Sequence, residues 1–125
     1  MYYDLEAWKI SMTLAEEIYM QTRRFPKEEL FGLISQMRRA AVSIPSNIAE
    51  GSARQSSREN IRFLQIARGS LAELETQVEL ASRIGFLPEE NFQKIRSLRT
   101  RTGKLLNGLT LRADTRLREA ESDNF

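Results

Sequence analysis

The sequence predicts an all-α protein, an antiparallel four-helix bundle with an up-down-up-down arrangement. Hydrophobic residues recur at spacings of three and four in four long segments, which is the pattern of amphipathic helices. Only 6 Gly and 3 Pro interrupt the 125 residues, and no segment shows the alternation of a strand. Because the connections are short, consecutive helices should run antiparallel. We expect one domain over residues 1–118 and a polar, fraying tail over residues 119–125.

The first helix is expected to begin near Asp4, whose carboxylate can cap free backbone amides. Its predicted core stripe comprises Leu5, Trp8, Met12, Ala15 and Tyr19. Three more apolar residues, Ile10, Leu14 and Ile18, widen the apolar arc to about 220°, which exceeds the face that one side of a bundle needs. They indicate either a subunit interface or ordinary exposed apolar side chains.

The second helix is predicted to begin at Pro26, followed by Lys27 and two acidic residues, and to end at Gly51. Pro45 lacks a backbone N–H and should bend or interrupt this helix over residues 41–45. The expected core stripe is Leu30, Leu33, Met37, Ala40, Ala41, Ile44 and Ile48.

The third helix is expected from about Ser57 to Ile84, with a capping box formed by Ser56 and Glu59 and a stop at Gly85. Its core stripe is Phe63, Leu64, Ala67, Leu71, Leu74, Val78 and Ala81. Pro88 opens the fourth helix, whose stripe is Phe92, Ile95, Leu98, Thr102, Leu106, Leu109 and Ala113.

A polar stripe runs beside the apolar one on the second helix. It consists of Gln36, Arg39, Ser43, Asn47, Glu50 and Arg54. Small hydroxyl and amide residues at the edge of a core favour hydrogen bonds to a neighbouring helix, and candidate partners on the third helix are Ser70, Glu73 and Gln77. Three interpretations of the stripe remain open: a hydrogen-bonded network that sets helix register, a site for a ligand or partner, and a face with no special role.

The net charge of +2 conceals segments of opposite sign. Residues 38–68 and 91–118 are strongly basic, whereas residues 69–90 are acidic. We expect one basic cluster around the turn between the second and third helices: Arg38, Arg39, Arg54, Arg58, Arg62 and Arg68. A second set lies on one side of the fourth helix: Lys94, Arg101, Lys104 and Arg112. Either group could bind phosphates, or it could simply be solvated.

Catalysis is not expected. The chain has no His and no Cys, which excludes thiolate nucleophiles, imidazole bases and zinc sites with nitrogen or sulfur ligands. Without His, the di-iron sites of helical bundles are excluded too, and no phosphate-binding loop is present. We therefore predict no enzyme activity, no metal and no cofactor. The chain has no apolar run long enough to span a membrane and no signal peptide at Met1, so we expect a cytoplasmic location.

Two segments resemble the bacterial 23S rRNA-intervening sequence proteins, also called four helix bundle proteins. Residues 38–51 read Arg-Arg-Ala-Ala-Val-Ser-Ile-Pro-Ser-Asn-Ile-Ala-Glu-Gly, and residues 63–77 read Phe-Leu-Gln-Ile-Ala-Arg-Gly-Ser-Leu-Ala-Glu-Leu-Glu-Thr-Gln. The resemblance extends from Leu5 to Leu109. The departures are Arg68, where many members have an uncharged residue, and Pro88, where many have Ser.

The resemblance implies a protein of undefined molecular role. The accessory protein of diversity-generating retroelements is similar to this family, and it forms a five-fold barrel whose basic surface engages nucleic acid and a reverse transcriptase. By that analogy we expect a homopentamer. The leading hypothesis is a bundle that binds RNA or DNA through Arg38, Arg39, Arg54, Arg58 and Arg62. The alternative is a scaffold that binds a protein partner and no nucleic acid.

Overall fold

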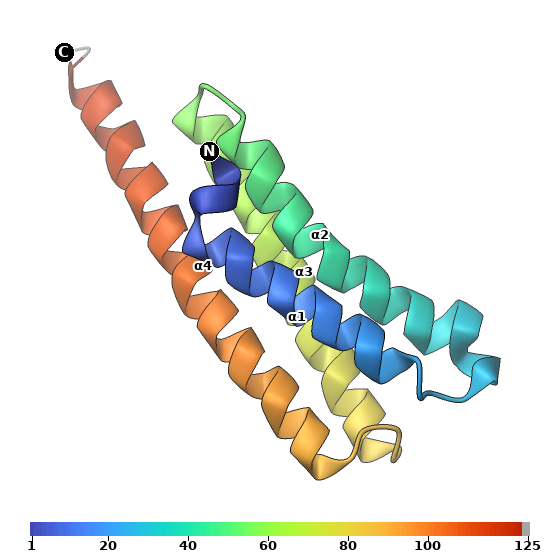
Figure 1. Ribbon diagram of the computed structural model, residues 1–125. Helices are drawn as coiled ribbons and strands as arrows, with labels where there is room; N and C mark the ends of the chain where they lie inside the picture. Colours follow the sequence, from blue (N-terminus) through green and yellow to red (C-terminus); the bar gives the residue numbers. More distant parts are fainter. Residues whose placement is uncertain (124–125) are drawn as a thin grey trace.

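Four helices run alternately up and down in the computed structural model, which describes residues 1–123 (Figure 1). They are α1 (Glu6–Thr22), α2 (Ser35–Ser52), α3 (Ser57–Arg83) and α4 (Glu89–Asp123). Each helix packs against the next one in sequence, and α1 also packs against α4, which closes the ring around one core. The predicted fold class, an all-α four-helix bundle, is confirmed. No helix within the described residues combines the length and hydropathy that a bilayer crossing requires.

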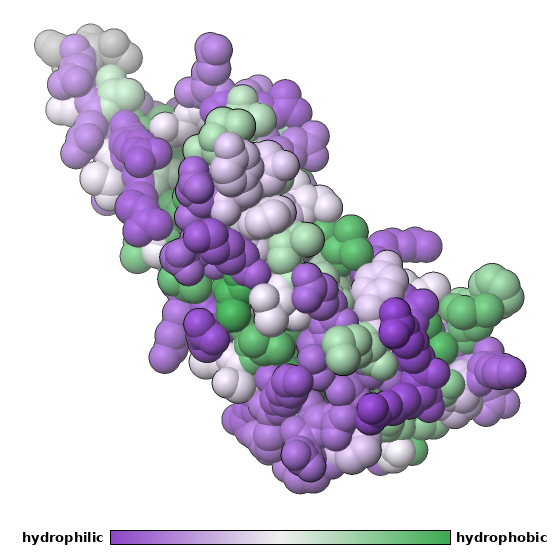
Figure 2. Space-filling model, viewed as in Figure 1, coloured by the Kyte–Doolittle hydropathy of each residue, from purple (hydrophilic) through white to green (hydrophobic). Residues whose placement is uncertain are grey.

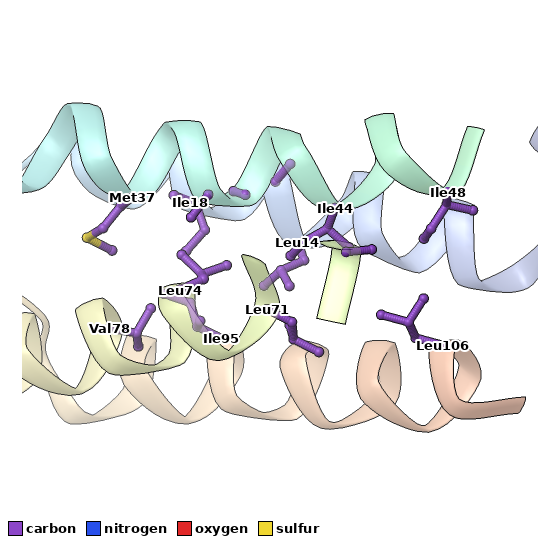
Figure 3. Packing of buried hydrophobic residues seen from close by; sticks show 14 of the residues in the cluster. Leu14, Ile18, Met37, Ile44, Ile48, Leu71, Leu74, Val78, Ile95 and Leu106 are labelled. Atoms are coloured by element: carbon purple, nitrogen blue, oxygen red, sulfur yellow. The ribbon is translucent and has the colours of Figure 1, made fainter. Parts of the chain in front are cut away.

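The core receives side chains from all four helices. Figure 3 shows Leu14 and Ile18 of α1, Ile44 of α2, Leu74 of α3 and Leu106 of α4 pointing into the same interior. The predicted stripes of α2, α3 and α4 supply most of this cluster, although Leu30 is exposed and Phe63, Phe92, Leu98 and Leu109 are only partly buried. Close packing of branched aliphatic side chains from every helix is the main stabilising contribution.

The expected interface residues of α1 are in the core. Leu14 and Ile18 are fully buried and Ile10 is 8% exposed within the single chain, so the prediction of a subunit interface at these residues is wrong. Trp8 is instead half-buried and Tyr19 is exposed. Amphipathic aromatic rings suit the rim of a bundle, where the polar group meets water, whereas compact aliphatic side chains fill the interior.

The start of α2 is irregular over residues 27–34. A 3-10 turn, Lys27–Glu29, is followed by a π-helical turn, Leu30–Ile34, in which Gly32 leaves the helical conformation. Regular α-helix begins only at Ser35. Pro26 therefore marks the connection between α1 and α2, but the regular helix begins nine residues after it.

Pro45 does not interrupt α2, which continues through it to Ser52. Pro45 removes one backbone donor, but it is buried with its neighbours Ile44 and Ile48 on the core side of the helix. Gly51 is helical and does not end α2. A Cβ atom there would lie 2.8 Å from Asn60 Oδ1, so Gly51 permits the close approach of α3.

The predicted ends of α3 agree with the structure. The Ser56 hydroxyl accepts a hydrogen bond from the Glu59 amide at 3.4 Å, and Gly85 has a φ of 87°, as an αL stop requires. The fourth helix extends further than expected, because residues 119–123 continue α4. Residues 124 and 125 of the predicted tail lie outside the described residues.

Candidate nucleic-acid interface

The polar stripe of α2 forms a small contact with α3. The Ser43 and Ser70 hydroxyl oxygens lie 2.8 Å apart, and Ser70 is one of the three candidate partners that the sequence offered on this helix. Asn47 Nδ2 donates to the carbonyl oxygen of Ser43 at 2.8 Å and to its hydroxyl at 3.0 Å. The Ser43–Ser70 bond joins the middle of α2 to the middle of α3, and Asn47 supports Ser43 from its own helix, which favours the interpretation as a structural network.

The other expected members of the network do not join it. Gln77 donates to Glu73 within α3 at 3.2 Å, and Arg54, just beyond the end of α2, donates to Glu50 at 3.3 Å. Gln36 is exposed. The prediction that all of these residues form one network between α2 and α3 is wrong, because side chains four residues apart on one helix reach each other more easily than the next helix.

The arginines expected around one turn do not all lie there, since Arg68 lies in the middle of α3 and Arg38 and Arg39 lie near the start of α2. Arg38 and Arg39 lie in the first turns of α2, whereas Arg54 follows the end of this helix at Ser52. At about 1.5 Å of rise per residue, α2 separates them by about 20 Å. The guanidinium of Arg38 stacks over Tyr19 at 4.6 Å and donates to Thr22 Oγ1 at 2.9 Å, so it links α2 to α1. Arg38 and Arg39 therefore do not belong to the predicted cluster at the turn.

Arg54, Arg58 and Arg62 do surround the turn between α2 and α3, and all three are exposed. Arg54 and Arg62 lie over the ring of Phe63, at 5.0 Å and 5.9 Å from its centroid. Arg58 donates to Glu121 of α4 at 2.8 Å. The ring of Phe63 orients two of the guanidinium groups toward solvent at this end of the bundle.

The pairing of α3 with α4 brings the two basic segments of the sequence together. Residues 54–72 and residues 99–118, which we call the basic half, lie against each other in this antiparallel pair (Figure 1). They contain ten Lys and Arg and only two acidic residues. Residues 73–98, the acidic half, contain five acidic and three basic residues. The α3–α4 pair is therefore electrically polar along its length.

A surface groove follows the contact between α3 and α4 in the basic half. Arg68 and Lys104 line it together with the carboxamides of Gln65 and Asn107, and no acidic side chain lines it. A Cβ atom added at Gly69 would meet nothing within 4 Å, so the groove is open there. Guanidinium, ammonium and carboxamide groups in such a groove are the donors that phosphate oxygens accept from.

A second hollow lies where α4 passes the turn between α2 and α3. Arg112 and Arg116 of α4 line it with Arg54 of the turn, beside Ser56 and Asn60. The basic half thus offers cationic side chains both between α3 and α4 and at the end of the bundle. Within residues 1–123, no three acidic side chains gather as metal ligands would.

The sequence shows the two basic segments, but we did not predict that they lie against each other in the fold. Arg68 and Lys104 are equally far from Phe86 in the sequence, and Phe86 lies in the connection between α3 and α4. In an antiparallel pair with a short connection, residues at equal distances from the connection face each other. That symmetry was the signal that could have placed Arg68 beside Lys104.

The outer face of α1 and α2 carries an apolar groove. Trp8, Met12, Val42 and Pro45 line it, with charged side chains such as Arg23 at its margin. Figure 2 shows pale and green surface over this face, interrupted and bordered by purple hydrophilic side chains. The unpartnered side of α1 is therefore the side opposite to Leu14 and Ile18.

Comparisons with known proteins agree with this architecture. Residues 3–108 match the sequence model of the 23S rRNA-intervening sequence proteins. A solved structure from Bacteroides thetaiotaomicron, described as a protein of unknown function from the S23 ribosomal protein family, matches with a TM-score of 0.75 and 27% identity. The match covers 83% of this chain and 97% of that one. A search of curated proteins found no match. The family match spans most of the chain, and the chain therefore belongs to the 23S rRNA-intervening sequence protein family.

Proposed function

We propose that this protein is a non-enzymatic, homo-oligomeric bundle that binds the phosphate backbone of RNA through its basic half. The observation that carries the proposal is the antiparallel pairing that places Arg68 of α3 and Lys104 of α4 in one groove. Neutralising several phosphates with clustered cations supplies most of the affinity of sequence-independent nucleic-acid binding.

The ion pairs of the basic half leave much of its charge uncompensated. Arg54, Arg58, Arg99 and Arg118 have acidic partners. No acidic partner lies within ion-pair distance, among the described residues, of the following exposed side chains: Arg62, Arg68, Arg101, Lys104, Arg112 and Arg116. An exposed field of one sign attracts a polyanion and speeds its association.

Filter binding of a structured RNA hairpin at low salt tests the proposal. The double variant Arg68→Glu, Lys104→Glu should bind at least about 10-fold more weakly than the wild type, because it replaces two phosphate contacts with repulsion. The matched control is Arg24→Glu, Arg96→Glu, which makes the same change in net charge on exposed residues outside the basic half. Equal losses in both variants, or no binding by the wild type, would refute a site in the basic half.

Self-association is the second part of the proposal. It is supported by the apolar groove on the outer face of α1 and α2, since contiguous exposed apolar surface marks interaction sites. Light scattering should give a mass above the 14.4 kDa of one chain, and the homopentamer implied by the family resemblance is the stoichiometry to test. A monomer at every concentration would contradict it.

The same apolar groove favours a second candidate function, a scaffold for a protein partner. A partner held by apolar contacts would stay bound in high salt and after nuclease treatment, whereas a complex bridged by RNA would not. Affinity capture from cytoplasmic extract, in the compartment expected for this protein, separates the two candidates.

A further inference from the structure

One aromatic side chain stands almost entirely in solvent. Phe31 is 92% exposed, and its neighbour Leu30 is 49% exposed. Both follow the turn that connects α1 to α2, at the end of the bundle away from the basic half. Exposed aromatic residues of this size are common as anchors that fill a pocket on a binding partner.

The turn that carries Phe31 is anchored on both sides. The Glu29 carboxylate accepts a hydrogen bond from the Leu33 amide at 3.1 Å, and Leu33 and Ile34 are buried in the core. A Cβ atom at Gly32 would lie 2.9 Å from Glu29 Oε2, so glycine lets this carboxylate close over the turn. The segment therefore presents Phe31 outward from a fixed position, which lowers the entropic cost of using it as an anchor.

The apolar groove on α1 and α2 is the complementary feature. Its walls come from Trp8 and Met12 on one helix and from Val42, Pro45 and Ala49 on the other. Because Phe31 is almost fully exposed, it does not fill the groove of its own chain. Each chain thus displays an aromatic anchor and a separate apolar groove, and neither covers the other.

The charges beside the two features are complementary as well. Arg23 and Glu16 line the groove, while Lys27 and Glu28 belong to the turn that precedes Phe31. Each side offers one charge of each sign. Two copies can therefore pair Arg23 with Glu28 and Glu16 with Lys27 at the rim of an apolar contact, an arrangement that contributes to specificity.

We propose that Phe31 of one copy inserts into the α1–α2 groove of a second copy. The proposal rests on the self-association proposed above and identifies the contact that produces it. The anchor and the groove are different surfaces, so the contact is head-to-tail, and each added copy leaves one anchor and one groove available. Such contacts continue until a ring closes.

Two single variants break the contact from opposite sides. Phe31→Asp removes the anchor, and Val42→Glu places a charge in the groove at an exposed position of α2. Each should raise the dissociation constant of the assembly at least about 30-fold, the loss typical of a central anchor. Leu111→Asp is the control, since it places the same charge on an exposed apolar residue of α4 outside this groove. Circular dichroism identifies any variant that fails to fold.

Mixing the two variants tests the head-to-tail geometry. Phe31→Asp keeps its groove and Val42→Glu keeps its anchor, so an equimolar mixture should form dimers and nothing larger by light scattering. A monomeric wild type would refute the proposed self-association itself. An oligomeric wild type whose mass is unaffected by Phe31→Asp and Phe31→Ala would refute only this contact. Two dissociated variants that remain monomeric when mixed would refute the head-to-tail arrangement.

Discussion

The two halves of the α3–α4 pair differ in how their charges are balanced. In the acidic half, Lys94 pairs with Glu17 of α1 at 3.3 Å and Arg83 pairs with Glu79 at 3.8 Å. In the basic half, Arg68 and Lys104 face a common groove that no acidic side chain lines. The Lys94–Glu17 pair joins α4 to α1, whereas the unpaired cations of the basic half remain available for a polyanion.

The largest expected effect is the salt dependence of RNA binding by the basic half. If about six cationic side chains contact phosphates, affinity should fall by about 10³ between about 50 mM and about 200 mM salt. The variant Arg68→Gln, Lys104→Gln should reduce the slope of log affinity against log salt by roughly 2. Fluorescence anisotropy with a labelled RNA measures both. An unchanged slope would place the phosphate contacts elsewhere.

The second effect concerns a buried carboxylate of α1 that pairs with Lys94 of the acidic half. The Glu17 carboxylate accepts from Gln21 at 2.8 Å and pairs with Lys94, and Glu17 is 6% exposed. Glu17→Ala leaves the Gln21 donor without this partner, so we expect a loss of about 1–3 kcal/mol in the free energy of unfolding. Urea denaturation measures it. Glu50→Ala, which removes only an exposed pair with Arg54, should cost under about 1 kcal/mol.

A smaller loss of stability is expected for the contact between α2 and α3 near the boundary of the basic and acidic halves. Ser70 contacts Ser43 through the one described hydrogen bond between side chains of α2 and α3. Ser70→Ala should lower the free energy of unfolding by about 1 kcal/mol. Asn47→Ala should cost a similar amount, about 1 kcal/mol, since both bonds that it donates go to Ser43 on its own helix. A loss much above that would show that Asn47 supports more than local structure.

The smallest effect comes from the pair that partly balances the basic half. Glu121 of α4 accepts from Arg58 at 2.8 Å, and both side chains are exposed. Glu121→Gln should change stability by under about 1 kcal/mol, because exposed pairs contribute little. It should also strengthen RNA binding about twofold by releasing a cation for phosphate. Weaker binding by this variant would count against the basic half as the RNA surface.

The spacing of hydrophobic residues within each segment was sufficient to predict the buried face of three of the four helices. On α2, α3 and α4, residues such as Met37, Leu74 and Leu106 recur at helical spacing on one narrow face, which leaves a single choice of buried side. On α1 the apolar arc is so wide that two choices remained, and the sequence favoured the face with Trp8 and Tyr19. The packing of α1 against both α2 and α4 selected Leu14 and Ile18 instead.

The sequence by itself determined the helical class of the protein, the basic and acidic segments and the absence of His and Cys, because these depend on composition and on periodicity within one segment. Only the tertiary structure decided which charged side chains lie close together. It separated Arg38 from Arg54 by most of the length of α2, and it brought Arg68 of α3 beside Lys104 of α4. The physical reason is that surface fields and grooves depend on distances between helices, which close packing of the core sets and local sequence does not.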